Sequence, residues 1–256
     1  MSRGAVYTLR VGCYRKGSGA LTAWPVRTEA SACARVIDEI CALSWSDLSK
    51  NSLTDLAWVY YYFSIQFREN LEIACHLHPN DVKLQQLMEE ECHTDNLSPW
   101  PGVASIGEKI NHDEFVRRLL KLSPIDQARQ WRLETIGRVY LDNVDKLDHM
   151  VRAASIGSYE DGGLERVFRA ILEAPDWSSP LLEAFEHFLT QHIRFDNNPD
   201  TGHGALSRHL GPDDQILPLW IGFKHMLIEA APTLLDIPAG AVPKTTSFEI
   251  RAGGVH

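Results

Sequence analysis

Apolar residues recur every three to four positions along most of the chain, which is the spacing of amphipathic helices. No stretch alternates apolar and polar residues between hairpin turns, and no internal repeat is found. The pattern predicts helices at 29–43, 52–76, directly after Pro79-Asn80, and at 112–121, 124–157, 163–173, 178–196, 203–210 and 213–230. About seven to eight helices with short connections favour an all-α fold, a single compact bundle.

Two ends and one internal stretch break this pattern. Residues 1–28 carry scattered glycines and are expected to form an irregular arm, and residues 232–256 an irregular tail, which leaves 29–231 as one helical domain. Residues 94–111 hold two prolines and two glycines and are predicted to be mostly loop.

Charge and composition exclude several classes of protein. The 34 acidic and 25 basic residues give a net charge of −9, so we expect no nucleic acid partner. No apolar run approaches the roughly 20 residues of a membrane helix, and the first residues have no apolar core typical of a secretory signal. The five cysteines form no C-x-x-C pair, which argues against a disulfide scaffold or a thiolate zinc site and favours a reducing cytoplasm.

Histidine and carboxylate residues gather near the predicted helix 178–196. His192 and Asp196 are four positions apart and share one helix face, and His203 would face the same way if the helix continued past Pro199. Imidazole and carboxylate on one inward face suit an iron or manganese site. The alternative is that they are solvated polar residues at a helix end.

Two further segments place carboxylates beside apolar positions. Glu90 follows Leu87 by three positions, on the apolar side of its helix, and forms a Glu-x-x-His pair with His93. Ferritin-type bundles need a second such pair, and none is present. Glu160 follows a stretch of small residues that allows close helix packing. The simpler explanation for both carboxylates is exposure to solvent.

The order of these segments resembles the heme-oxygenase-like dimetal oxidases and oxygenases, a family of iron-containing redox enzymes. The resemblance spans about residues 52–231 and depends on five features of the sequence. They are the aromatic run WVYYYFSIQF, Leu87-Met88-Glu89-Glu90, Asn111-His112-Asp113-Glu114-Phe115, Gly157-Ser158-Tyr159-Glu160, and finally His192, Asp196 and His203-Gly204. The last signature is the most specific.

The resemblance implies a set of metal ligands, which are Glu90, His112, Glu160, His192, Asp196 and His203. The family usually has Asp-x-x-His, so Asp200 is a rival for Asp196. The long loop 94–111 leaves His93 as an alternative to His112. An extra glutamate on the first core helix, found in N-oxygenating members, has Glu69 or Glu72 as candidates.

These ligands imply two Fe(II) ions with O₂ as cosubstrate and an external electron donor. Three buried carboxylates would cost several kcal/mol each, and two Fe²⁺ ions would compensate their charge while leaving positions open for O₂. The expected activity is oxidation of a small amine-bearing metabolite, by N-oxygenation or by oxidative C–H or C–C chemistry. Side chains expected to line the substrate pocket are Trp58, Tyr61, Tyr62 and Phe63. A redox partner and a homodimer are further expectations.

Three alternatives remain open. A metal-free enzyme on the same scaffold would be a cofactorless oxidase or a thiaminase-like hydrolase, the latter with Cys75 or Cys92 as nucleophile. True haem binding would need one proximal histidine and would leave the carboxylates unexplained. A non-catalytic helical binding protein would make the ligand set a coincidence.

Overall fold

The computed structural model describes residues 31–196, 202–211 and 214–236. Within them the chain is helical, and only the isolated bridges Thr94–Ile110 and Trp100–Ala104 have strand-type pairing. The all-α prediction is confirmed. The helices are α1 (Ala32–Cys41), α2 (Lys50–Leu77), α3 (Val82–Cys92), α4 (His112–Leu119), α5 (Gln127–Val144), α6 (His149–Ser158), α7 (Leu164–Ile171), α8 (Pro180–Asp196), α9 (His203–Ser207) and α10 (Leu217–Ala230).

Shorter helical turns connect or end these helices. A π turn, η3, covers Tyr159–Gly163 between α6 and α7. The 3-10 turns are Trp45–Asp47, Leu120–Leu122, Arg208–Leu210, Asp214–Ile216 and Pro232–Leu235. The last of these falls at the start of the segment expected to be an irregular tail. The expected arm 1–28 and the rest of that tail lie outside the described residues.

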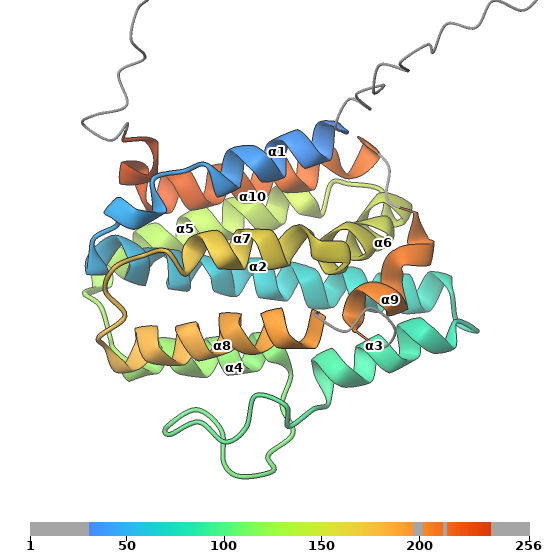
Figure 1. Ribbon diagram of the computed structural model, residues 1–256, viewed down its shortest axis with the longest axis horizontal. Helices are drawn as coiled ribbons and strands as arrows, with labels where there is room; N and C mark the ends of the chain where they lie inside the picture. The colour runs from blue at the N-terminus through green and yellow to red at the C-terminus, as the bar shows by residue number, and fades with distance from the viewer. Residues whose placement is uncertain (1–30, 197–201, 212–213, 237–256) are drawn as a thin grey trace, which may run out of the picture.

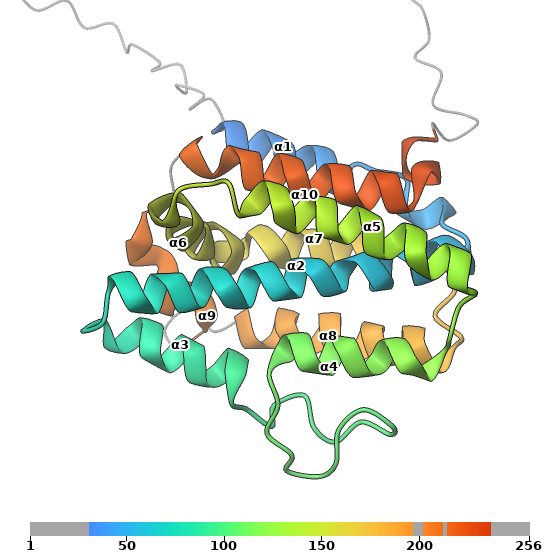
Figure 2. The same ribbon diagram turned by 180° about the vertical axis from the view of Figure 1, so that it is seen from behind.

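The long helix α2 runs through the middle of the molecule (Figures 1 and 2). The Ser49 hydroxyl caps its start by accepting a hydrogen bond from the amide of Ser52, and the helix contains neither glycine nor proline. Its buried side chains cover a wide stripe, because α3, α4, α5, α6, α8 and α10 all contact it. Packing against six other helices stabilises α2 along its whole length of 28 residues.

The other helices form layers on either side of α2 (Figures 1 and 2). On one side, α1 packs along α10, and α10 also contacts α5. On the other side, α4 and α8 lie next to each other, and α3 continues along α2 beyond the end of α4. No described helix is both long and apolar enough to cross a membrane.

The segment 93–111 between α3 and α4 is a loop, as predicted. Its two ends meet where the Ile110 amide donates to the Thr94 carbonyl at 3.0 Å. Arg118 of α4 donates to the Val103 carbonyl and pairs with Glu108, so the loop is tied back to the helix that follows it.

The prediction of a single helix over residues 124–157 is wrong. The chain forms α5 and α6 instead, separated at residues 145–148. Asp126, rather than Ser123, caps α5 by accepting from the Arg129 amide. Asp148 caps α6 in the same way with the Met150 amide, and an aspartate that competes for backbone amides favours a new helix start. The chain is therefore divided into more helices than the seven to eight expected.

Candidate metal centre

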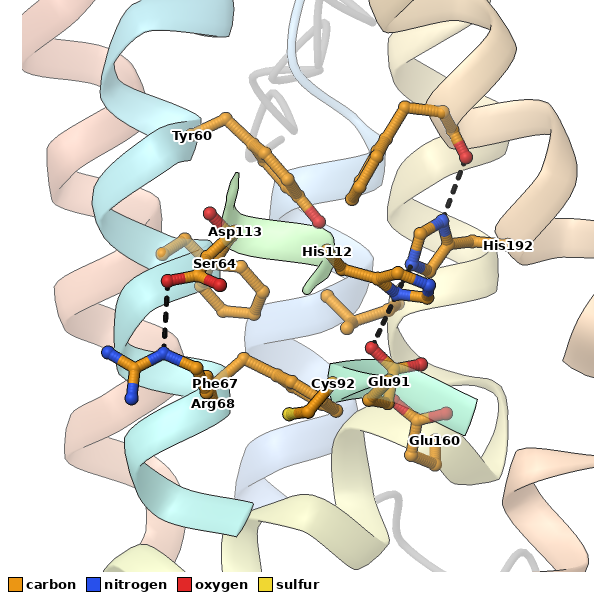
Figure 3. Close-up of a pocket in the computed structure, with 13 residues that line it drawn as sticks. Tyr60, Ser64, Phe67, Arg68, Glu91, Cys92, His112, Asp113, Glu160 and His192 are labelled. Atoms are coloured by element: carbon orange, nitrogen blue, oxygen red, sulfur yellow. Dashed lines mark hydrogen bonds and ion pairs between the residues drawn. The ribbon is translucent and has the colours of Figure 1, made fainter. Parts of the chain in front are cut away.

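Histidine and glutamate side chains from distant parts of the chain converge beside α2. They form two groups whose donor atoms lie within 4.8 Å of one another: Glu91, His112 and His192, and Glu91, Glu160 and His203. All of these residues are buried. Figure 3 shows Glu91, His112, His192 and Glu160 pointing toward one another from different elements. Glu91 belongs to both groups.

The first group is built from the last turn of α3, the first residue of α4, and α8. His112 Nδ1 lies 2.6 Å from Glu91 Oε2 and 2.9 Å from His192 Nε2. His192 Nδ1–H donates to the Phe188 carbonyl at 2.8 Å, so Nε2 presents its lone pair to the group. The other nitrogen of His112, Nε2, is turned away toward Asn96 Oδ1. Three donor atoms therefore face one point.

The second group lies on the other oxygen of Glu91. His203 Nδ1 is 3.1 Å from Glu91 Oε1 and 3.2 Å from Glu160 Oε2, while its Nε2 is 3.2 Å from Glu90 Oε2. Although Glu91 Oε1 is buried and close to His203, it makes no hydrogen bond of acceptable geometry. A buried anionic oxygen is costly without a positive neighbour, which here is His203 and which a metal ion would also supply.

The protonation of the cluster follows from burial and from the opposite charges packed together. Burial lowers the pKa of His192 to about 3, so this imidazole is neutral at physiological pH. Burial raises the pKa of Glu160. Against the effect of burial, His112 and His203 hold the pKa of Glu91 well below its usual value. Carboxylates around His203, Glu160 first, likewise outweigh burial and raise its pKa well above the usual value.

Backbone geometry at η3 and α9 brings Glu160 and His203 together. Glu160 sits in the π turn, and Gly162 two residues later has φ +86°, a conformation that glycine adopts without strain. Gly204 follows His203 at the start of α9, where a Cβ atom would lie 2.8 Å from the Glu160 carbonyl oxygen. Only glycine allows this approach of α9 to η3.

The structure brings together four of the residues proposed as ligands, His112, Glu160, His192 and His203. Asp196 is the last residue of α8, but its side chain lies outside the described residues, as does all of Asp200.

Glu91 is the functional candidate that the sequence interpretation missed. Its side chain is 4% exposed, whereas that of Glu90 is 37% exposed and touches the cluster only through His203. The buried positions of α3 include Leu84, Leu87 and Glu91, so Glu91 lies two turns after Leu84 on the core face. That seven-residue spacing was the available signal, and the prediction used only the spacing from Leu87.

The remaining alternative ligands lie apart from both groups. His93 is exposed at the end of α3. Glu69 Oε2 pairs with Arg152 at 3.1 Å, and Glu72 Oε1 pairs with Arg68 at 2.6 Å. Each of these glutamates has its own arginine partner, and neither belongs to the donor groups.

A cavity of about 20 Å³ adjoins the donor groups, which is room for a water-sized guest. Its apolar wall includes Phe63, together with Tyr60, Phe67, Leu164 and Phe188. The other three aromatic residues expected to line a substrate pocket, Trp58, Tyr61 and Tyr62, line a separate surface groove with Arg117 and Lys121.

Comparison with known proteins gives no relative from which to assign this site. No protein-family model, no curated protein and no solved structure matches the chain. The function of the site is therefore inferred from its own residues.

Proposed function

We propose that the cluster binds two Fe(II) ions and that the protein uses O₂ to oxidise a small amine-bearing metabolite. The observation that carries this proposal is the position of Glu91, which directs one oxygen to each of two three-donor groups. A carboxylate shared in this way is the arrangement that two neighbouring cations need. The heme-oxygenase-like fold, suggested by the order of the motifs, is part of the same proposal.

The chemistry of the donor set supports iron. All donors are imidazole nitrogens or carboxylate oxygens, and His/carboxylate sets with open positions are typical of non-haem Fe(II) oxygenases. Two dications would also offset the buried charge of Glu91 and Glu160, which otherwise raises the free energy of the folded state. Iron bound there would supply one-electron and O₂ chemistry, with electrons from an external donor.

The residues around the donors have separable roles in this proposal. Phe63, Phe67 and Phe188 exclude water from the adjoining cavity, so O₂ would meet an apolar surface. Arg68 and Asp113 pair at 3.0 Å at the polar side of the same cavity, where a charged substrate would arrive. N-oxygenation and oxidative C–H or C–C chemistry are both compatible with this arrangement.

Two alternatives have less support. A hydrolase would need a thiolate, but burial raises the pKa of both Cys75 and Cys92, so both are thiols at neutral pH. Haem would need one proximal histidine and would leave the buried carboxylates Glu91 and Glu160 without a role.

Anaerobic Fe(II) titration of the metal-free protein, followed by rapid mixing with O₂, tests the proposal. We expect about two irons per chain and a transient visible absorption band after mixing. His192→Ala should remove a donor from the first group and lower uptake to about one iron. The control is His93→Ala, which changes an exposed histidine outside both donor groups and should leave uptake unchanged. If the wild-type protein takes up no iron, the proposal is wrong.

A further inference from the structure

One side chain outside the donor groups controls how His112 faces them. His112 Nε2 lies 3.0 Å from Asn96 Oδ1, on the side of the ring opposite Glu91 and His192. The amide of Asn96 can point only one way, because its Nδ2 donates to the Glu90 carbonyl at 3.1 Å. The oxygen must therefore face His112, and His112 Nε2 must carry a hydrogen and donate it.

This hydrogen bond determines which nitrogen of His112 is available. With Nε2–H directed at Asn96, Nδ1 is the nitrogen that faces the donor group, 2.6 Å from Glu91 Oε2. Without a metal, Nδ1 donates its hydrogen to that carboxylate, and a bound metal ion would take the place of this hydrogen. His192 achieves the same result through the Phe188 carbonyl, so the two histidines are oriented by a side-chain and a backbone acceptor respectively.

Asn96 also links the two elements that supply Glu91 and His112. Its Nδ2 holds the carbonyl of Glu90, the residue before Glu91 at the end of α3, and its Oδ1 holds His112 at the start of α4. The relative position of Glu91 and His112 therefore depends on the side-chain amide of Asn96.

The loop 93–111 fixes Asn96 in place. The backbone N–H of Asn96 donates to Thr94 Oγ1 at 3.2 Å. The Thr94 carbonyl in turn accepts from the backbone N–H of Ile110, two residues before His112. The next residue, Leu97, is held from α8, where His187 Nε2 donates to its carbonyl at 3.2 Å.

We infer that Asn96 is a positioning residue of the metal centre, which holds His112 in the Nε2–H form and sets its distance from Glu91. The inference rests on the proposed dimetal function. A ligating histidine usually donates its second N–H to such a partner, and loss of the partner typically weakens metal binding about 10–100-fold.

The first test is Fe(II) affinity, measured anaerobically against a competing chelator. Asn96→Ala should bind the ion of the first group about 10–100-fold more weakly than wild type. Asn96→Asp keeps an acceptor for His112 but loses the donor to the Glu90 carbonyl, so it should recover part of the affinity. Asp95→Ala changes the exposed neighbour in the same loop and is expected to bind as wild type does. Asn96→Ala binding within twofold of wild type, in a folded protein, would overturn the inference while leaving the dimetal proposal intact.

A second readout needs no metal. In metal-free wild type, nuclear magnetic resonance of ¹⁵N-labelled histidine should show a His112 Nε2–H proton that exchanges slowly with water, because the hydrogen bond to Asn96 protects it. Asn96→Ala should lose this signal, and Asn96→Asp should keep it. Absence of the signal in wild type overturns the inference independently of whether iron binds.

Discussion

Two adjacent glutamates at the end of α3 differ in what they touch. Glu91 lies within reach of both donor groups, whereas Glu90 reaches only the outer nitrogen of His203. Gln86 also donates to Glu90 at 2.8 Å, so Glu90 already has a neutral partner at the surface. The roles of the two residues can therefore be separated by identical substitutions.

Glu91→Gln should impair both metal positions, because it removes the shared negative charge and one anionic oxygen from each group. We expect total Fe(II) affinity to fall by more than about 100-fold, beyond the loss typical of a residue that only supports a ligand. Glu90→Gln is the matched control and should lower affinity by less than about tenfold. Anaerobic titration of both variants makes the comparison, and equal losses would contradict the assignment of Glu91 as the bridging residue.

Four members of the two donor groups, His112, Glu160, His192 and His203, could be predicted from the sequence because each lies in a distinctive local motif. The choice between Glu90 and Glu91 needed a second apolar position, Leu84, since both residues lie within a turn of Leu87. Asn96 had no such pattern, because its role depends on the folded path of a loop.

The aromatic run of α2 illustrates a different limit. Successive helix residues are about 100° apart, so a continuous run of aromatic side chains covers the whole circumference. Tyr60 and Phe63 face the cavity, whereas Trp58 and Tyr61 face the groove on another side. Without a polar position inside the run, the sequence does not indicate which side faces the donors.

At the scale of elements, the close approach of α9 to η3 sets the distance between His203 and Glu160 in the second donor group. Gly204→Ala places a Cβ atom 2.8 Å from the Glu160 carbonyl oxygen, so α9 must shift and carry His203 with it. We expect Fe(II) uptake to fall from about two ions to about one, with the first group retained.

Gly222→Ala is the control for this substitution. Its added Cβ would lie 3.5 Å from the Tyr140 ring, an ordinary contact, and alanine in the interior of α10 should stabilise the helix by roughly 0.5–1 kcal/mol. Thermal unfolding and iron titration of both variants separate loss of the site from loss of the fold. A Gly204→Ala protein that keeps two irons would show that α9 tolerates the shift.

The sequence predicted helices better than it predicted their ends. The loop 93–111 follows from proline and glycine, which act locally, whereas α2 was expected to start at residue 52 and is capped three residues earlier, by Ser49. The break between α5 and α6 was missed because Asp145 and Asp148 lie inside a pattern that remains helical in period. There, the competition between continuing a helix and capping a new one depends on packing.

At the scale of the whole molecule, the donors come from α3, α4, η3, α8 and α9. Metal bound there would connect segments that are far apart in the chain, and it would bind the folded protein far better than the unfolded one. Fe(II) at 100 times its Kd should therefore stabilise the fold by about 2.7 kcal/mol, which raises Tm by roughly 5–10 °C.

Anaerobic calorimetry with and without Fe(II) measures this shift, and a chelator should reverse it. His192→Ala should show a smaller shift because one group has lost a donor, while His93→Ala should match wild type. An unchanged Tm at saturating Fe(II) would mean that the donor groups are not joined by metal in the folded state.

The central position of α2 has a consequence for how the protein can change. Residues of α2, among them Tyr60, Phe63 and Phe67, form much of the cavity wall, yet none of the donors in the described groups belongs to this helix. Substitutions along its inner face would reshape the chamber beside the histidines without removing a ligand. Mutational libraries confined to that face therefore offer a way to alter the substrate preference of the proposed enzyme while all residues of the donor groups stay unchanged.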